Sequence, residues 1–451
     1  MEDTIAAIST ALGVGAISIV RLTGTDSIKI ANSVFQGANL AKVKTHTINY
    51  GHIVDKNLII DEVLVSIMRG PQTFTMEDVV EINCHGGIAT TRKVLELVLT
   101  RGCRLAEPGE FTKRAFLNGR IDLIEAEGVM DLINAKTEQA RNLAINQVEG
   151  KISFLIKSLR QEIIEILANI EVNIDYPEYE DIEEMTIKTL KPKMDEIKNK
   201  IQKLINESNN GRLIKEGIKT VIIGRPNVGK SSLLNRLIGE EKAIVTDIAG
   251  TTRDSVEGTL NIGGVVLNIV DTAGIRKTED KVEKIGVNKS IELISNAELI
   301  LYVLNNNEKL DFEDYEILKR LEDKQYIIII NKIDLDNNLE IDKLPKNHQI
   351  NMSMTKNQGL EELKTKITEL FNLEKIYTGD FTYITSARSL AILNKVLESI
   401  DEIEYGMSVN TPIDMLEIDI KKIWNDLGEI IGETYQEELI DQLFSQFCLG
   451  K

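Results

Sequence analysis

The sequence predicts a protein of several domains, in which an N-terminal α+β domain precedes a helical domain that is interrupted by an inserted α/β domain. Three observations predict this class. A strand-like run, a glycine-rich loop and a helix-like run follow one another within residues 220–237. Short β-like runs fill the first hundred residues. Long apolar stripes at helical spacing lie before and after the glycine-rich loop, as in helices that bury one face.

The first predicted domain spans residues 1–120. Helical periodicity over 88–100 stops at Gly102, and glycine commonly follows the last turn of a helix. The predicted strands, which are alternating or continuous apolar runs, cover 16–22, 47–54, 58–68 and 79–83. Mixed strands and helices of this kind predict an α+β fold.

The second predicted domain is helical and discontinuous, with residues 121–215 and 375–451 on either side of an insertion. Apolar residues recur at steps of three and four from Ile152 to Ile170, which places one stripe along a long helix. Segments 389–403 and 412–432 repeat this pattern. The inserted domain, residues 216–374, is predicted to be Ras-like.

The glycine-rich segment at residues 224–231, Gly-Arg-Pro-Asn-Val-Gly-Lys-Ser, indicates a phosphate-binding loop. Its glycines let backbone N–H groups turn toward a phosphate, the next helix directs its positive end there, and Ser231 offers a hydroxyl to magnesium. The predicted nucleotide contacts in this loop are Asn227, Val228, Gly229, Lys230, Ser231 and Ser232.

Two later segments follow in the order that a guanine-nucleotide domain requires. Asp271, Thr272, Ala273 and Gly274 end a strand-like run, which places a carboxylate near the magnesium and a glycine near the terminal phosphate. Asn331, Lys332, Ile333 and Asp334 end another run. The carboxylate of Asp334 can accept two hydrogen bonds from guanine that adenine does not offer, so GTP is favoured over ATP. Ser353-Met354, ahead of Thr355, fits a weaker base-contacting loop, although each segment alone could be only a turn.

Residues 246–254 are rich in hydroxyls and are predicted to form the first switch loop, with Thr252 as the second protein ligand of magnesium after Ser231. Gly274 is followed by Ile275, where Ras-like GTPases have a glutamine that orients water, so hydrolysis needs another route. The nucleotide contacts predicted in the switch loop are Thr246, Asp247, Ile248, Ala249, Gly250, Thr251 and Thr252.

Composition limits the classes of protein that remain. The three cysteines, Cys84, Cys103 and Cys448, have no metal-like spacing and fit a reducing cytoplasm. The chain shows no basic leader and no apolar run of membrane length, which predicts a soluble protein. A formal charge of −18 gives no general support for RNA binding, so a nucleic-acid contact would need a local basic patch or a partner's surface.

Two more segments carry a family resemblance: residues 107–120, Glu-Pro-Gly-Glu-Phe-Thr-Lys-Arg-Ala-Phe-Leu-Asn-Gly-Arg, and the final Cys448-Leu449-Gly450-Lys451. Together with the loops above, they make the chain resemble the MnmE (TrmE) family of tRNA modification GTPases from its first residue to its last. The loops are shared with several bacterial GTPases, whereas these two segments are specific to the family.

The resemblance implies a route for hydrolysis. A potassium ion would take the place of an arginine finger, held by Asn227 and by oxygens of Thr246, Ile248 and Thr251. A monovalent cation beside the phosphate oxygens offsets the charge that builds during transfer. The resemblance also implies that Glu283 is catalytic and orders the attacking water. Without it, Glu283 would be a solvated helix residue.

The resemblance further implies a site for a tetrahydrofolate derivative in the N-terminal domain. Glu81 can pair with the amino-pyrimidine edge of the pterin, and cations at Arg21 and Arg120 suit the glutamate tail. Lys451 completes the set. Residues 9–12, Ser-Thr-Ala-Leu, depart from the two prolines expected there. Cys448 is a further candidate, for which a structural or orienting role is favoured over a nucleophilic one. Unaided, the charged residues would be surface charges.

Taken as a whole, the resemblance implies a potassium-dependent GTPase that installs an aminomethyl-type (carboxymethylaminomethyl) group at the wobble uridine of certain tRNAs. The implied partners are a second copy of the chain, joined through the N-terminal domains, and an FAD- and NADH-dependent protein of the GidA type (MnmG). The alternatives are a regulatory GTP switch in ribosome assembly, which the shared phosphate loop permits, and a folate-dependent methyltransferase.

Overall fold

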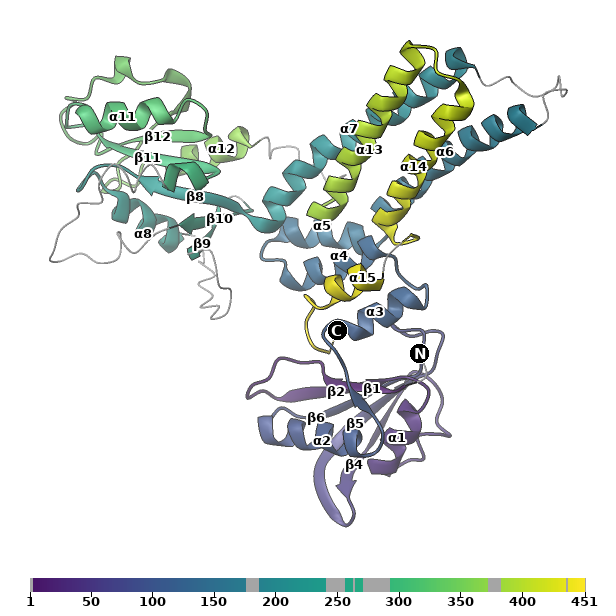
Figure 1. Ribbon diagram of the computed structural model, residues 1–451. Coiled ribbons are helices and arrows are strands. Elements are labelled where there is room, and N and C mark those ends of the chain that lie inside the picture. The colour runs from purple at the N-terminus through teal and green to yellow at the C-terminus, as the bar shows by residue number, and fades with distance from the viewer. Residues whose placement is uncertain are drawn as a thin grey trace. The chain divides into compact units, whose positions relative to one another are not determined.

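The computed structural model describes residues 3–175, 186–240, 256–262, 264–270, 293–371, 383–434 and 437–450. The chain forms two compact units. One contains Met1–Met130, Gln147–Pro192 and Glu398–Lys451, and the other contains Asp131–Asn146 and Lys193–Leu397. Figure 1 shows the elements of each unit, and the chain passes between the units more than once.

The N-terminal part of the first unit is built on a seven-stranded sheet with the order β3-β4-β5-β6-β2-β1-β7. Neighbouring strands are antiparallel except for β1 and β7, which are parallel. The strands are β1 (Ile5–Ile8), β2 (Ile17–Thr23), β3 (Phe35–Gly37), β4 (Thr47–Asp55), β5 (Leu58–Met68), β6 (Val79–His85) and β7 (Arg104–Leu105). The four predicted strands are confirmed as β2, β4, β5 and β6. The other three are too short to show a period in the sequence.

Helices α1 (Ser27–Val34) and α2 (Ile88–Thr100) supply the apolar side chains that cover one face of this sheet. The prediction for α2 is confirmed, and Gly102 after it has a φ of +116°. Side chains alternate along β2, so that Val20 and Leu22 are buried on the helix side and Arg21 lies on the opposite face. The sheet register places Arg21 directly opposite Glu81 of β6.

The segment that follows the sheet is helical and packs against the end of the chain. It contains α3 (Glu110–Leu117) and α4 (Leu123–Asn134), and the C-terminal helix is α15 (Glu437–Phe444). Phe116, Leu123, Phe444 and Phe447 form one buried cluster between these helices. The C-terminal residues are therefore held beside the start of the helical region, although the two segments are far apart in the sequence.

Long helices make up the rest of the helical region: α5 (Glu138–Val148), α6 (Lys151–Asp175), α7 (Ile187–Glu216), α13 (Ala387–Ser408) and α14 (Ile413–Ile431). The predicted stripe on α6 is confirmed, because Ile152, Ile156 and Ile163 are completely buried. Helix α14 lies along α6, and the Arg160 guanidinium is 4.2 Å from the centre of the Trp424 ring.

The second unit contains a six-stranded sheet with the order β13-β12-β11-β8-β10-β9, parallel except for the β9–β10 hairpin. Its strands are β8 (Ile218–Ile223), β9 (Val256–Ile262), β10 (Val265–Val270), β11 (Leu299–Asn305), β12 (Tyr326–Asn331) and β13 (Gln349–Asn351). Its helices include α8 (Lys230–Glu240), α11 (Phe312–Arg320) and α12 (Leu360–Leu370). Apolar clusters bury both sides of the sheet, as expected for a parallel sheet with helices on its two faces.

Three neighbouring parallel strands of this sheet end at the same edge. Strand β8 ends at Ile223, β11 ends at Asn305 and β12 ends at Asn331. Ligands of open α/β sheets bind outside the carboxyl ends of the strands. The loops that follow these three strands therefore lie together, although 108 residues separate the end of the first strand from the end of the third (331 − 223).

Candidate functional site

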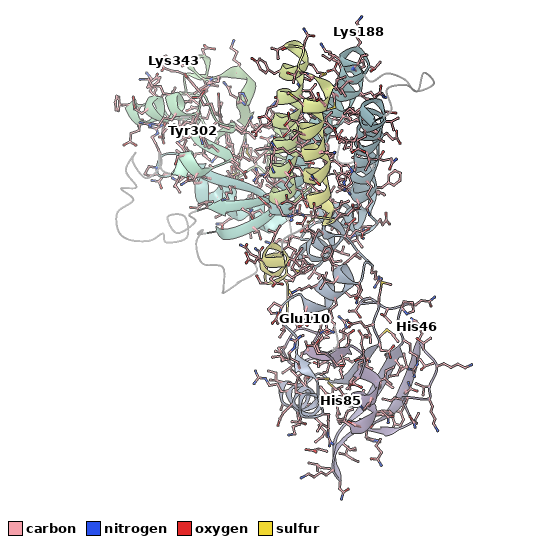
Figure 2. The ribbon with its side chains drawn as sticks, turned by 45° about the vertical axis from the view of Figure 1, so that its right-hand side comes forward. His46, His85, Glu110, Lys188, Tyr302 and Lys343 are labelled. Atoms are coloured by element: carbon pink, nitrogen blue, oxygen red, sulfur yellow. The ribbon has the colours of Figure 1, made fainter. Side chains whose placement is uncertain are left out.

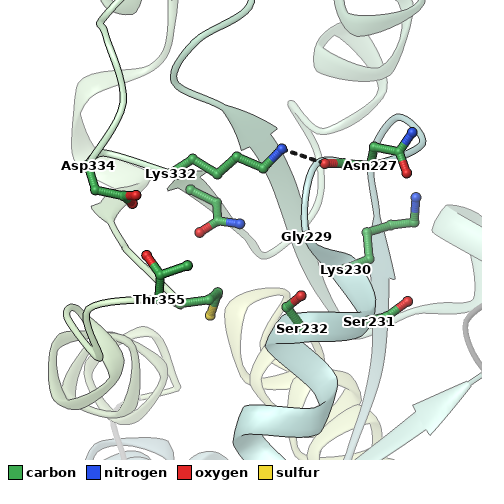
Figure 3. Close-up of a pocket in the computed structure, with 10 residues that line it drawn as sticks. Asn227, Gly229, Lys230, Ser231, Ser232, Lys332, Asp334 and Thr355 are labelled. Carbon is green, nitrogen blue, oxygen red and sulfur yellow. Dashed lines mark hydrogen bonds between the residues drawn. The ribbon is translucent and has the colours of Figure 1, made fainter.

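A cavity of about 290 Å³ opens at this edge of the sheet. Its lining comes from three loops that are distant in sequence (Figure 3). The lining residues are Asn227, Gly229, Lys230, Ser231, Ser232, Asn331, Lys332, Asp334, Met354 and Thr355. The phosphate loop, the Asn-Lys-x-Asp segment and the weaker base-contacting loop, each predicted separately, thus border one space.

Glycine is required at two positions of the phosphate loop. Gly224 has a φ of +143°, and a Cβ there would lie 2.3 Å from the carbonyl oxygen of Val303. Gly229 has a φ of +110°, and a Cβ there would lie 2.1 Å from Nδ2 of Asn331. Side chains at either position would clash with neighbouring groups and strain the backbone. The glycines therefore let the loop pack against β11 and the Asn-Lys-x-Asp segment.

Lys230 is the first residue of α8, and its side chain folds back over the loop. Its Nζ donates to the carbonyl oxygens of Gly224 at 2.9 Å and Arg225 at 2.8 Å. The positive end of α8 and the Lys230 amine thus face the same cavity. A cation and a helix N-terminus at one wall suit an anionic phosphate ligand.

The Asn-Lys-x-Asp segment is tied to the phosphate loop by two hydrogen bonds. Asn331 donates from Nδ2 to the carbonyl oxygen of Val228 at 2.8 Å. Lys332 donates from Nζ to the carbonyl oxygen of Asn227 at 2.7 Å, the contact dashed in Figure 3. The Asn331 side chain is buried, and its Oδ1 atom has no hydrogen-bond partner among the described residues. An unmet acceptor at the wall of a cavity suits a ligand with a donor group.

Asp334 lies at the far end of the cavity from the phosphate loop (Figure 3). Its Oδ1 accepts a hydrogen bond from the Ser353 hydroxyl at 2.6 Å, and that bond is the main reason that the pKa of Asp334 is lowered. Ser353 Oγ is also 3.0 Å from Oγ1 of Thr355. The Asp334 side chain is therefore an oriented, ionised acceptor, as needed to receive the amino and imino donors of guanine.

A second group of predicted residues meets on the sheet of the N-terminal part. Arg21 donates from Nε to Oε1 of Glu81 at 2.9 Å and from Nη1 to the carbonyl oxygen of Gly450 at 3.2 Å. The Ser9 hydroxyl donates to the same carbonyl oxygen at 3.1 Å, and the Gly109 amide donates to the Cys448 carbonyl oxygen at 3.2 Å. The C-terminal residues thus lie against β1 and β2, with the Cys448 side chain exposed.

Arg120 has different hydrogen-bond partners from Arg21, but each guanidinium lies near a phenylalanine ring, and the two rings belong to one apolar cluster. Arg120 donates to the carbonyl oxygen of Thr73 at 3.0 Å, and its guanidinium is 5.0 Å from the Phe74 ring centre. The guanidinium of Arg21 is 5.8 Å from the ring centre of Phe111. Phe74 packs against the buried cluster that contains Phe111. Both guanidinium groups are therefore held by cation–π contacts with rings of the same apolar cluster.

Comparison with known proteins identifies the family of the chain. A model of the MnmE helical domain matches residues 123–448, and a model of the GTP-binding protein TrmE N-terminus matches residues 4–120. The chain is 54% identical over 455 aligned residues to the tRNA modification GTPase MnmE of Bacillus cytotoxicus, covering all of this chain and 99% of that protein. This chain belongs to the MnmE family of tRNA modification GTPases.

Other matches extend the comparison. The MnmE protein of Ligilactobacillus salivarius is also 54% identical, over all of this chain and 98% of that protein. The G domain of the T. maritima FeoB iron transporter matches 34% of this chain at 26% identity with a TM-score of 0.24. A TM-score in that range does not establish a shared fold, so the family membership depends on the sequence matches.

Several residues predicted for the nucleotide site, and one predicted for the folate site, lie outside the described residues. They are Thr246, Asp247, Ile248, Ala249, Gly250, Thr251, Thr252, Asp271, Thr272, Ala273, Gly274, Glu283 and Lys451. Their roles stay predictions. Among the described residues, no group of three or more His, Cys, Asp and Glu side chains could hold a metal ion. None of the described helices is both long and apolar enough to cross a membrane.

The sequence predicted no role for an ionic cluster in the family-specific segment 107–120. Glu110, labelled in Figure 2, accepts hydrogen bonds from Arg114 at 3.0 Å and from Arg104 at 2.5 Å. Arg114 is 1% exposed and also donates to Oδ1 of Asp3 at 2.7 Å. The spacing of Glu110 and Arg114, four residues apart on one helix, was a signal for their pairing. These contacts give Glu110 and Arg114 a structural role in the segment.

His85, also labelled in Figure 2, lies at the end of β6 with most of its side chain exposed. Its Nδ1 is 2.7 Å from Oδ1 of Asp61, and its backbone amide donates to Oδ2 of the same carboxylate at 2.7 Å. The Asp61 carboxylate thus fixes both the ring and the start of the turn that follows β6. This arrangement accounts for the histidine as a turn residue.

Proposed function

We propose that this chain is a potassium-dependent GTPase that, together with an FAD-dependent partner, installs an aminomethyl-type group at the wobble uridine of certain tRNAs. The observation that carries the GTPase part is the single cavity bordered by three separately predicted loops. Membership of the MnmE family supports the tRNA part. The one-carbon unit would come from a tetrahydrofolate derivative.

The nucleotide would lie with its phosphates at the start of α8 and its base at Asp334. Lys230 and the backbone of residues 227–232 would bind the phosphates, while Asp334 would accept the two donors of guanine. Thr355 and Met354 border the base end of the cavity. Residues 271–274 and the switch residues 246–252 would complete the contacts to the phosphates.

Magnesium would be held by Ser231 and Thr252, and potassium by Asn227 together with oxygens of Thr246, Ile248 and Thr251. Ser231 and Asn227 both line the cavity at its phosphate end, and their hydroxyl and amide oxygens are ligand types that suit these cations. Bound cations would supply positive charge beside the phosphate oxygens during cleavage. Glu283 would orient the attacking water, since Ile275 offers no polar group for that task.

The folate derivative would bind on the open side of the N-terminal sheet, near Arg21, Glu81, Arg120 and Lys451. The half-buried Arg21 and Glu81 side chains support this proposal, because Oε2 of Glu81 is not used in its contacts with Arg21. Cys448 would contribute to the edge of that site. A titration that compares the binding of a tetrahydrofolate derivative to Glu81→Gln and to the unaltered protein tests this proposed site. Equal affinity would exclude Glu81 from the site.

The remaining parts of the proposal concern assembly. Domain bounds of 1–120, 121–215 with 375–451, and 216–374 are supported at the first boundary by family models that match 4–120 and 123–448. The N-terminal domains would join two copies, and a GidA-type (MnmG) protein would be the partner. The site of action would be the cytoplasm, where tRNAs are modified.

Mass spectrometry of tRNA nucleosides tests the function as a whole. Cells that lack the protein should lose the modified wobble uridine, and the unaltered gene should restore it. A Lys230→Ala variant should not restore it, because the phosphates lose their cation. Wobble nucleosides that stay unchanged in the deleted cells would overturn the tRNA part of the proposal.

A further inference from the structure

Arg225 lies in the phosphate loop, but it is not among the described residues that line the cavity. Its side chain extends to the segment that runs from the last residue of β11 into the first turn of α11, which we call the 305–314 segment. Nη1 is 3.0 Å from Oδ2 of Asp311, Nε is 3.3 Å from Oδ2 of Asp314, and Nη2 is 3.2 Å from Oε2 of Glu308. Nη2 also donates to the carbonyl oxygen of Lys309 at 3.2 Å. One guanidinium thus has four partners on one segment.

The acidic partners of Arg225 are themselves fixed. Asp311 and Asp314 form a capping box at the start of α11, in which each side chain accepts from the other's backbone amide at 3.0 Å. Asp314 is completely buried and accepts a hydrogen bond from the Tyr302 hydroxyl at 2.5 Å. Tyr302 belongs to β11 and is labelled in Figure 2. Burial raises the pKa of Asp314, and hydrogen bonds and the Arg225 charge oppose that change.

The same segment also contacts the loop after β12, which carries Asp334. The Asn306 amide donates to the carbonyl oxygen of Asn331 at 2.9 Å, and the Asn306 side chain donates to the carbonyl oxygen of Leu335 at 3.3 Å. Asn338 donates from Nδ2 to Oδ1 of Asn307 at 2.8 Å. The 305–314 segment therefore contacts the loop that carries Asp334 at one end and Arg225 at the other.

The carbonyl oxygen of Arg225 links the contacts of this residue to the cavity. It accepts the 2.8 Å hydrogen bond from Nζ of Lys230, a residue that lines the cavity. A shift of Arg225 would therefore move the Lys230 amine and the turn that leads to Asn227. Such a movement would affect binding, because charged groups must match the positions of the phosphate oxygens.

We propose that Arg225 is a positioning residue for the nucleotide. Through its contacts with the 305–314 segment, it holds the phosphate loop in the geometry that binds phosphate. The same contacts join the phosphate loop to the loop that carries Asp334. This inference rests on the proposed GTP site and adds a residue that does not touch the ligand. A purely structural role would instead affect the unfolding temperature and leave nucleotide affinity unchanged.

Calorimetric titration of the full-length protein with GDP and Mg²⁺ tests this proposal. Arg225→Ala should raise the Kd for GDP about tenfold, because charge-assisted hydrogen bonds are lost. Arg225→Lys keeps the charge but loses the planar guanidinium with its several N–H donors, so its Kd should lie between those of the alanine variant and the unaltered protein. Lys343→Ala is the matched control. It removes an exposed ion pair with Glu340 in the same unit, 2.6 Å long, and should not change the Kd.

A double-mutant cycle separates positioning from general stabilisation. Asp311→Asn removes a carboxylate while keeping a good helix cap, and in the Arg225→Ala background it should add little further loss of GDP affinity. Additive losses, or an Arg225→Ala protein that binds GDP as tightly as the unaltered one, would overturn the proposal. If Arg225→Ala does not fold, the Arg225→Lys and Asp311→Asn proteins decide the question by the same titration. Absence of GDP binding in the unaltered protein would instead refute the proposed GTP site.

Discussion

Nδ2 of Asn331 lies 2.8 Å from the carbonyl oxygen of Val228, and this hydrogen bond is one of two that join the Asn-Lys-x-Asp segment to the phosphate loop. The two residues are 103 positions apart in the sequence. The Asn331 side chain is almost completely buried. Its removal would leave a buried carbonyl oxygen without its donor, which is costly in the absence of water.

Asn331→Ala should therefore weaken the binding of both GTP and GDP. The expected cost of about 1.5 kcal/mol corresponds to about a tenfold higher Kd. Titration with each nucleotide measures it. The contact serves both nucleotides, so a loss that affects GTP alone would contradict this account.

Asp334→Asn should change which base is bound. An amide donates where the carboxylate accepts, so the variant should lose about tenfold or more in kcat/KM for GTP and gain activity with xanthosine triphosphate, which carries a carbonyl in place of the amino group. Asp336→Asn is the matched control, since this neighbouring acid does not line the cavity. If the Asp334 variant shows unchanged preference for GTP, the base lies elsewhere.

Asn227→Ala should reduce the dependence of hydrolysis on potassium. The proposed ion would lose its amide ligand, so the ratio of kcat in potassium to kcat in sodium should fall toward one. Turnover measured at matched ionic strength gives this ratio. A potassium preference that survives in the variant would assign the ion to other ligands.

Glu283→Ala should abolish hydrolysis while nucleotide binding is retained. Positioned acids and bases contribute about a hundredfold or more to rate, so single-turnover hydrolysis should slow by at least that factor. Glu279→Ala, a neighbouring acid, is the control and should hydrolyse GTP at the normal rate. Equal turnover in both variants would remove Glu283 from the mechanism.

Glu110→Gln should destabilise the fold by about 2 kcal/mol near neutral pH, because Arg104 and Arg114 lose a buried carboxylate. Burial alone would raise the pKa of Glu110, but hydrogen bonds from Arg104, the Glu107 amide and Arg114 lower it below the ordinary 4.5. The carboxylate therefore stabilises the fold above that ordinary value, and this contribution is lost as the pH falls through the lowered pKa.

Denaturant unfolding at several pH values measures this effect. The difference in unfolding free energy between the unaltered protein and Glu110→Gln should be constant from pH 6 to about pH 7 and should shrink below about pH 4. Glu138→Gln breaks the exposed pair with Arg141 and should show little change. A difference that grows at low pH would show that folding raises the pKa of Glu110 instead of lowering it.

Much of the secondary structure could be predicted because its signals are local. The bounds of β5 and α2 agree with prediction at both ends, since alternation and helical spacing are visible within ten or so residues. The short strands β1 and β7 were not predicted, because their pairing depends on partners distant in sequence. The ion cluster at Glu110 was missed for the same reason, as Asp3 and Arg104 come from other elements.

The sequence by itself determined the phosphate loop, the Asn-Lys-x-Asp segment and the family, because each depends on residues close together in the chain. Only the tertiary structure decided that β8, β12 and β13 belong to one sheet and bring the loops that follow them to one cavity. Only it paired Arg225 with acids more than eighty residues away and Arg21 with the carbonyl of Gly450. The physical reason is that strand pairing and burial select partners across the whole chain, and no local pattern records which distant residues will meet.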